Sequence, residues 1–161
     1  MVCIYIDVDN YLRDWLINSY GASDAIAFHK GSAEAATLRA FLRRRTLADA
    51  PDLPGPASIA VRLPQSKDRD PATWNVLSGK GRELLLKTIK ARFDAELFAD
   101  VFPCLGANTA DALISAWMEA HGIEINDTNF QTVLKRFNRR KSRFMAARRQ
   151  ARLRAAIKSR K

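Results

Sequence analysis

The chain has 161 residues, enough for one compact domain with an added segment, and its 47% hydrophobic content is that of a globular protein. It holds 27 Lys and Arg against 17 Asp and Glu, so its formal net charge of +10 favours a polyanionic partner. Apolar runs fall short of the roughly eighteen residues that span a membrane, a secretory pattern is missing, and both cysteines are isolated, so we expect a cytoplasmic protein without a membrane partner, nucleoid-associated if bacterial.

The N-terminal third predicts two strands, each followed by a helix. Residues 2–8 alternate between apolar side chains and others, which is typical of a half-buried strand. A helix should follow over 11–20 and end at a glycine, with a short second strand over 25–30. A second helix is predicted over 33–47, with Arg43–Arg45 near its C-terminus, where cations suit the helix dipole.

The rest of the chain predicts one more strand and then helices alone. A proline-rich loop at 50–56 leads to a strand over 58–63. Apolar residues then recur every three or four positions over 81–102, and a shorter helix should cover 110–121. The predicted fold class is therefore α+β, with a small sheet of about three short strands in the N-terminal half, covered by helices. Three helices complete it, the last one long and basic.

The last 34 residues carry nearly half of the basic side chains. From Thr128 to Lys161 the sequence has thirteen Lys and Arg and no acid, which leaves fourteen basic and all seventeen acidic residues before it. The formal charge is thus −3 over residues 1–127 and +13 over 128–161. We therefore predict a compact α+β body, 1–127, and a basic C-terminal helix or arm, 128–161, whose first half packs on the body.

The basic segment should be helical. It contains no Pro or Gly from Thr128 onward, and Asn126 or Asp127 can cap its start. Past Met145 the apolar stripe thins, so we expect the helix to leave the body there and to be disordered when alone. An anionic membrane surface is the main electrostatic competitor of nucleic acid, but the weak apolar side fits a membrane helix poorly. The predicted stripe is Phe130, Val133, Leu134, Phe137, Phe144 and Met145.

The last two predicted helices resemble a helix-turn-helix. Residues 110–121 form the first helix, and a turn over 122–125 leads to the second. In such a motif the first turns of the second helix face the major groove, where Asn129, Gln131 and Thr132 should contact base edges. The alternative is the helical hairpin of an ordinary bundle, which has the same pattern. The predicted phosphate-binding residues follow contiguously: Lys135, Arg136, Arg139, Arg140, Lys141, Arg143, Arg148, Arg149, Arg152 and Arg154.

A second candidate site lies at the end of the first predicted strand, which reads IYIDVDN over residues 4–10. A strand that ends in D-x-D-N resembles the first strand of PIN-like and NYN-type ribonucleases. Those enzymes gather carboxylates at strand ends to hold a divalent metal, so the resemblance implies that Asp7 or Asp9 is a metal ligand. The strand at 58–63, however, ends without an acid. The alternative is that Asp9 or Asn10 caps the first helix.

A third candidate would extend the basic surface across the body. It combines Arg43–Arg45 with a second group that acidic residues interrupt, so we interpret that second group mainly as solvated surface. The second group is Lys80, Arg82, Lys87, Lys90 and Arg92.

Taken together, these patterns favour a nucleic-acid-binding protein rather than an enzyme. The sequence lacks GxxxxGK[ST], GxSxG and HExxH, so we expect no cofactor, no metal and no catalytic residues. We expect DNA rather than RNA as the partner, with a regulatory or architectural role as in phage or mobile-element systems. Two alternatives stay open: a metal-dependent nuclease using Asp7 and Asp9, and a structural subunit of a ribonucleoprotein or packaged genome.

Overall fold

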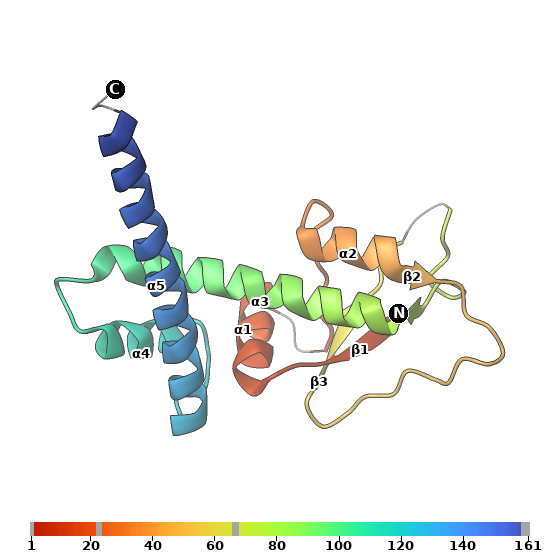
Figure 1. Ribbon diagram of the computed structural model, residues 1–161. Coiled ribbons are helices and arrows are strands. Elements are labelled where there is room, and N and C mark those ends of the chain that lie inside the picture. The colour runs from red at the N-terminus through yellow and green to blue at the C-terminus, as the bar shows by residue number, and fades with distance from the viewer. Residues whose placement is uncertain (1, 22–23, 66–67, 159–161) are drawn as a thin grey trace. The chain divides into compact units, whose positions relative to one another are not determined.

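A computed structural model describes residues 2–21, 24–65 and 68–158 and confirms the α+β class (Figure 1). The chain forms two compact units. Unit 1 comprises Met1–Phe93 and His121–Glu124, and unit 2 comprises Asp94–Ala120 and Ile125–Lys161. The boundary between the units therefore falls inside one helix and does not coincide with the change of charge at Thr128. In the described ranges no helix is long and apolar enough to cross a membrane.

Unit 1 contains the predicted first and last strands as an antiparallel pair. Strand β1 (Cys3–Asp7) lies beside β3 (Ser58–Arg62), with Ile4 opposite Val61 and Ile6 opposite Ile59. These four side chains are buried because alternation in both strands places them on the same face of the pair. The predicted face of the first strand is thereby confirmed.

The second predicted strand is reduced to a single bridge. Of residues 25–30, only Ile26 pairs, parallel to Val61 of β3. Its backbone N–H donates to the Ala60 carbonyl at 2.9 Å, and its carbonyl accepts from Arg62 N–H at 2.8 Å. Because Ile26 is fully buried while the residues after it are half-buried or exposed, one apolar anchor is all that this segment contributes to the sheet.

The predicted helix over 33–47 is too long. Helix α2 (Ala33–Phe41) ends where Leu42 takes up an extended backbone, and a two-residue strand β2 (Leu42–Arg43) pairs antiparallel with β4 (Val76–Leu77). Leu42 and its partner Leu77 are both buried, so packing between segments overrides the local helical preference. Arg43–Arg45 consequently lie in a strand and loop, not in the last turn of a helix as predicted.

The core of unit 1 is built between α1 (Asn10–Tyr20) and the first part of α3 (Gly79–Val101). Trp15 is completely buried, and its ring meets Phe93 edge to face with centroids 5.3 Å apart. Gly21 ends α1 in the left-handed conformation, as predicted. The apolar residues that recur along α3 are buried at Leu85, Ile89, Phe93, Leu97 and Val101.

Unit 2 packs the end of α3, the 3-10 turn η1 (Phe102–Cys104), α4 (Ala110–Ala120) and α5 (Asp127–Lys158). Side chains cap both later helices. The Thr109 hydroxyl accepts from Ala112 N–H at 3.3 Å, and Asn126 Oδ1 accepts from Asn129 N–H at 2.9 Å. The buried positions of this helix pair include Ile114 and Met118 of α4 and Val133 and Phe137 of α5.

Candidate nucleic-acid interface

Helix α5 carries the basic segment as one unbroken helix through Lys158 (Figure 1). The predicted disorder past Met145 is therefore not what the structure shows, because good helix formers continue the helix without packing. The apolar side chains past this point are largely exposed, since Met145, Leu153 and Ile157 are 49%, 60% and 62% exposed. Most predicted phosphate ligands are also exposed, namely Lys135, Arg139, Arg140, Arg143, Arg148, Arg149, Arg152 and Arg154.

One predicted phosphate ligand is already occupied. Arg136 makes a two-point ion pair with Asp94 of α3, with Nε 2.6 Å from Oδ1 and Nη2 2.9 Å from Oδ2. Such fork-to-carboxylate geometry is the strong form of an ion pair. Arg136 therefore positions α5 against α3 within unit 2 instead of presenting an unpaired charge, and its contact with phosphate stays a prediction. Lys141 is half-buried.

The predicted base-reading residues do not share an exposed face. Asn129 is only 5% exposed, because it lies on the α5 face of Val133 and Phe137, four and eight residues further on. The prediction that Asn129 faces outward is wrong. Thr132 is half-buried and its hydroxyl donates to the Thr128 carbonyl at 2.8 Å. Among the three, Gln131 alone is classed as exposed.

The connection between α4 and α5 is also longer than a typical helix-turn-helix turn. It covers residues 121–126, of which 121–124 belong to unit 1. There Glu124 N–H donates to Asp14 Oδ2 of α1 at 3.3 Å, and Gly122, at φ 66°, lies close to Asn18. The connection is thus anchored on α1, and the geometry matches the helical-hairpin alternative as well as it matches a DNA-reading motif.

A recess in unit 2 brings aromatic and basic side chains together. It has a volume of about 310 Å³ and lies between the end of α3 and the middle of α5. We call it the Phe–Arg recess, and its lining is Asp94, Phe98, Arg136, Arg139, Arg140, Arg143 and Phe144. Four arginines against one aspartate give this lining a formal charge of +3, so it favours an anionic ligand.

Two phenylalanines line the recess, Phe98 and Phe144, and two more, Phe102 and Phe137, lie against Phe98. Phe137 is buried, Phe98 and Phe102 are half-buried, and Phe144 is 41% exposed. Phe98 and Phe102 stack with centroids 4.6 Å apart, and Phe144 approaches Phe102 at 5.1 Å in an edge-to-face arrangement. The guanidinium carbon of Arg140 lies 5.7 Å from the centre of the Phe98 ring, within cation–π range.

Sequence reasoning missed the α3 side of this recess. In the sequence, Asp94 is one of several acids that we interpret as solvated surface. Phe98 and Phe102 each lie one position after a residue of the predicted apolar stripe, Leu97 and Val101, and so outside that stripe. The signal was present in that spacing, since Phe98 and Phe102 are four residues apart and widen the apolar face of α3 toward a second neighbour. Nothing local in the sequence, however, indicates that this neighbour is the basic helix.

Two carboxylates near β1, Asp9 and Asp52, are each held by a cation. Asp9 takes the N-cap position of α1, but its side chain makes no capping bond and instead lies 3.0 Å from Lys90 Nζ. Asp52 Oδ2 accepts from Tyr5 N–H at 3.0 Å and from Arg82 Nη2 at 2.8 Å. The described residues contain no group of three or more His, Cys, Asp or Glu side chains able to share a metal ion.

The antiparallel pairing of β1 with β3 also differs from the parallel arrangement that the ribonuclease resemblance implies. The carboxyl end of β1 therefore lies beside the start of β3, with Asp7 opposite Ser58, and not beside another strand's carboxyl end. The resemblance at Asp7 and Asp9 remains one of local sequence.

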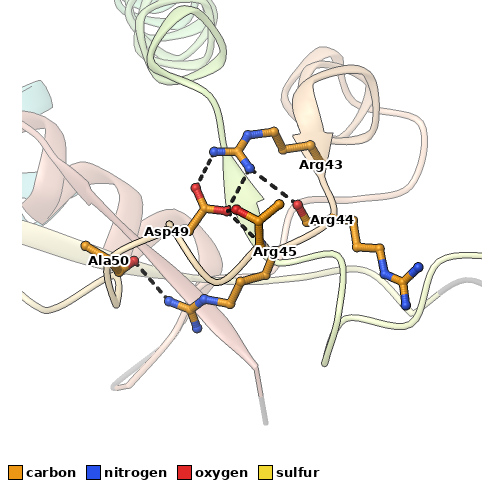
Figure 2. Close-up of polar contacts among 6 residues, drawn as sticks. Arg43, Arg44, Arg45, Asp49 and Ala50 are labelled. Atoms are coloured by element: carbon orange, nitrogen blue, oxygen red, sulfur yellow. Dashed lines mark hydrogen bonds and ion pairs between the residues drawn. The ribbon is translucent and has the colours of Figure 1, made fainter.

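Two of the three consecutive arginines are tied down by the loop that follows them (Figure 2). Arg43 makes two bonds to Asp49, one of them from Nη1 to Oδ2 at 2.8 Å, and Arg45 donates to a loop carbonyl at 3.0 Å. These hydrogen bonds from Arg43, followed by those from Thr46, hold the pKa of Asp49 far below its usual range. Figure 2 shows the Arg44 side chain directed away from this network.

No protein-family model matches the chain, and no significant match is found among curated proteins or solved structures.

Proposed function

We propose that this protein binds nucleic acid through α5, mainly by contacts with phosphates. One observation carries the proposal: a 32-residue helix has exposed basic side chains along its length and no acid after Asp127. None of Arg139, Arg143 and Arg148–Arg154 makes an ion pair with any residue in the described part of the chain. Their charge is thus available to a polyanion, and phosphate neutralisation dominates the affinity of such binders.

The proposal favours an architectural role over sequence-specific regulation. Base readout needs several polar side chains on one exposed face, whereas Asn129 is buried and Thr132 bonds to its own helix. Phosphate contacts carry no sequence information, so the protein should bind many sequences with similar affinity. We retain DNA as the partner expected from the sequence, and a binding role rather than a catalytic one.

The test is the salt dependence of binding. Replacing Arg148, Arg149, Arg152 and Arg154 with Ala removes four charges and keeps strong helix formers. On duplex DNA the slope of log K against log salt should become shallower by about 0.9 per lost contact, or about 3 to 4 if all four engage. Gel-shift or fluorescence titrations at several salt concentrations measure this slope, and the loss should be equal for unrelated DNA sequences.

A matched control removes the same charge elsewhere. Arg44, Arg62, Lys80 and Lys87 are exposed residues of unit 1, and their joint replacement with Ala lowers the net charge by the same amount. The proposal requires the α5 variant to lose far more affinity than this control. Equal losses in the two variants would mean that net charge, and not α5, governs binding.

A further inference from the structure

The Phe–Arg recess has a composition that phosphate contact alone does not explain. A helix that touches only phosphates needs exposed cations, whereas here two aromatic rings, the half-buried Phe98 and the exposed Phe144, open onto the same recess as the cations. Proteins that bind single strands combine these two features, because bases stack on aromatic rings while cations follow the backbone. Duplex binding makes no use of an aromatic face, since the bases of a duplex already stack on one another.

We propose that the Phe–Arg recess takes one unpaired base, stacked on Phe144, while arginines around it hold the adjoining phosphates. The ligand class is single-stranded nucleic acid. This inference rests on the proposed function and deepens it, because it assigns a second mode of contact to the same helix.

The aromatic side of the recess has room for a stacking partner. Phe144 is 41% exposed, and neither of its ring neighbours lies parallel to it: the interplanar angle is 67° with Phe102 and 54° with Phe98. Among the described residues, no parallel ring therefore covers it. Phe98 and Phe102, stacked at 20°, support Phe144 from the side of α3 and η1. The platform thus belongs to packed helices and is positioned before a ligand arrives.

The basic side of the recess is divided into one structural and three ligand-directed arginines. Arg136 is held by both oxygens of Asp94, so this pair contributes no net charge. Arg139, Arg140 and Arg143 are exposed and make no ion pair with a described residue. They occur within about one and a half turns before Phe144 on α5, so phosphates on either side of a stacked base lie within their reach.

Volume also favours a single base over a larger ligand. At about 310 Å³ the recess stands at the lower end of the range for small-molecule sites. A duplex can fill it only by extruding a base, which costs its stacking and pairing energy. A single strand bears a much smaller cost, so it should gain from the recess where a duplex does not.

The experiment compares two single strands that differ only in their bases. One is an oligothymidylate of about a dozen nucleotides, a length within the usual site size for single-strand binders. The other is an abasic strand with the same number of phosphates. We expect the full-length protein to bind the thymidylate about 5- to 150-fold more tightly, the value of one base stacked on an aromatic ring. A 2-aminopurine placed in the strand should lose fluorescence on binding.

Variants at adjacent positions identify the ring responsible. Phe144→Ala should abolish the base-dependent advantage and leave the salt slope unchanged, whereas Phe144→Trp should preserve the advantage. Met145→Ala is the matched control, since Met145 is similarly exposed at 49% and does not line the recess. Thermal unfolding of each variant shows whether unit 2 stays folded, and the tryptophan variant keeps the test valid if the alanine variant does not fold.

Each outcome separates the inference from the proposed function. Equal affinity for the thymidylate and the abasic strand, or an advantage that survives Phe144→Ala, overturns the recess as a base site while the salt-slope test of α5 still stands. Absence of binding to every strand and duplex overturns both. An oligouridylate series, with its own abasic control, distinguishes RNA from DNA as the source of the strand, and a base-dependent advantage in either series supports the inference.

Discussion

The cations of unit 1 and those of α5 are used in opposite ways. In unit 1, Arg43 pairs with Asp49, Arg82 with Asp52, and Lys90 with Asp9, so arginine and lysine join segments that lie far apart or close a loop. In α5 the ion pair of Arg136 with Asp94 lies at the inner face, and the arginines from Arg139 to Arg154 are exposed and make no ion pair with a described residue. The same side chains therefore serve folding in one region and, by our proposal, binding in the other.

This contrast teaches that net charge is a poor guide to a binding surface. Residues 1–127 contain fourteen basic side chains, but their acids outnumber them and several hold them in place. What distinguishes α5 is the absence of compensating acids. Ion pairs that are partly buried restrict both side chains, whereas unpaired exposed cations keep their charge for a partner.

The largest expected effect that tests this contrast between unit 1 and α5 is on the free energy of unfolding. Arg82 donates to the Tyr5 carbonyl of β1 and to the Asp52 carboxylate, so Arg82→Ala should lower the free energy of unfolding by about 1–2 kcal/mol, a value reduced by the partial exposure of the pair. Arg148→Ala should change it by less than about 0.5 kcal/mol. Urea unfolding measures both. Equal losses would show that α5 cations are structural after all.

A smaller expected effect concerns Arg136, the α5 cation whose acid partner is Asp94. Asp94→Asn removes the negative charge that compensates Arg136 and raises the charge of the Phe–Arg recess by one. The slope of log K against log salt should become steeper by up to about 0.9, because one more cation can meet a phosphate. Duplex and single-strand titrations measure it. An unchanged slope, with an unfolding midpoint close to that of the parent, would mean that Arg136 stays out of reach even when unpaired.

The smallest effect concerns the loop that Arg43 closes with Asp49. Hydrogen bonds lower the pKa of Asp49, so the stability it contributes is complete above its unfolded pKa near 4 and is lost as pH falls toward the folded value. Asp49→Asn should therefore lower the unfolding midpoint slightly at pH 7, and this difference should shrink below about pH 4. Binding should not change. Urea unfolding across this pH range, with Asp24→Asn as an exposed control, measures the trend, and a difference that grows in acid would contradict it.

Several features could be predicted from local patterns because their causes are local. Alternation identified the buried face of β1, the glycine after Tyr20 ended α1 as expected, and Asn126 caps α5. Each depends on residues within a few positions of one another. Predictions were wrong where contact with a distant segment determined the local structure. Helix α2 stops early because Leu42 pairs with Leu77, thirty-five positions away, and no propensity in its own sequence indicates that partner.

The amino-acid sequence by itself determined the separation of charge and the long basic helix, since composition and the absence of Pro and Gly need no tertiary partner. The tertiary structure alone decided which basic side chains remain available. Arg136 and Arg139 look alike in the sequence, but Asp94, forty-two residues before Arg136, neutralises one of them. The tertiary structure also buries Asn129 and places Phe98 beside Phe144, because contacts across such distances depend on how helices pack and not on the residues adjacent in the chain.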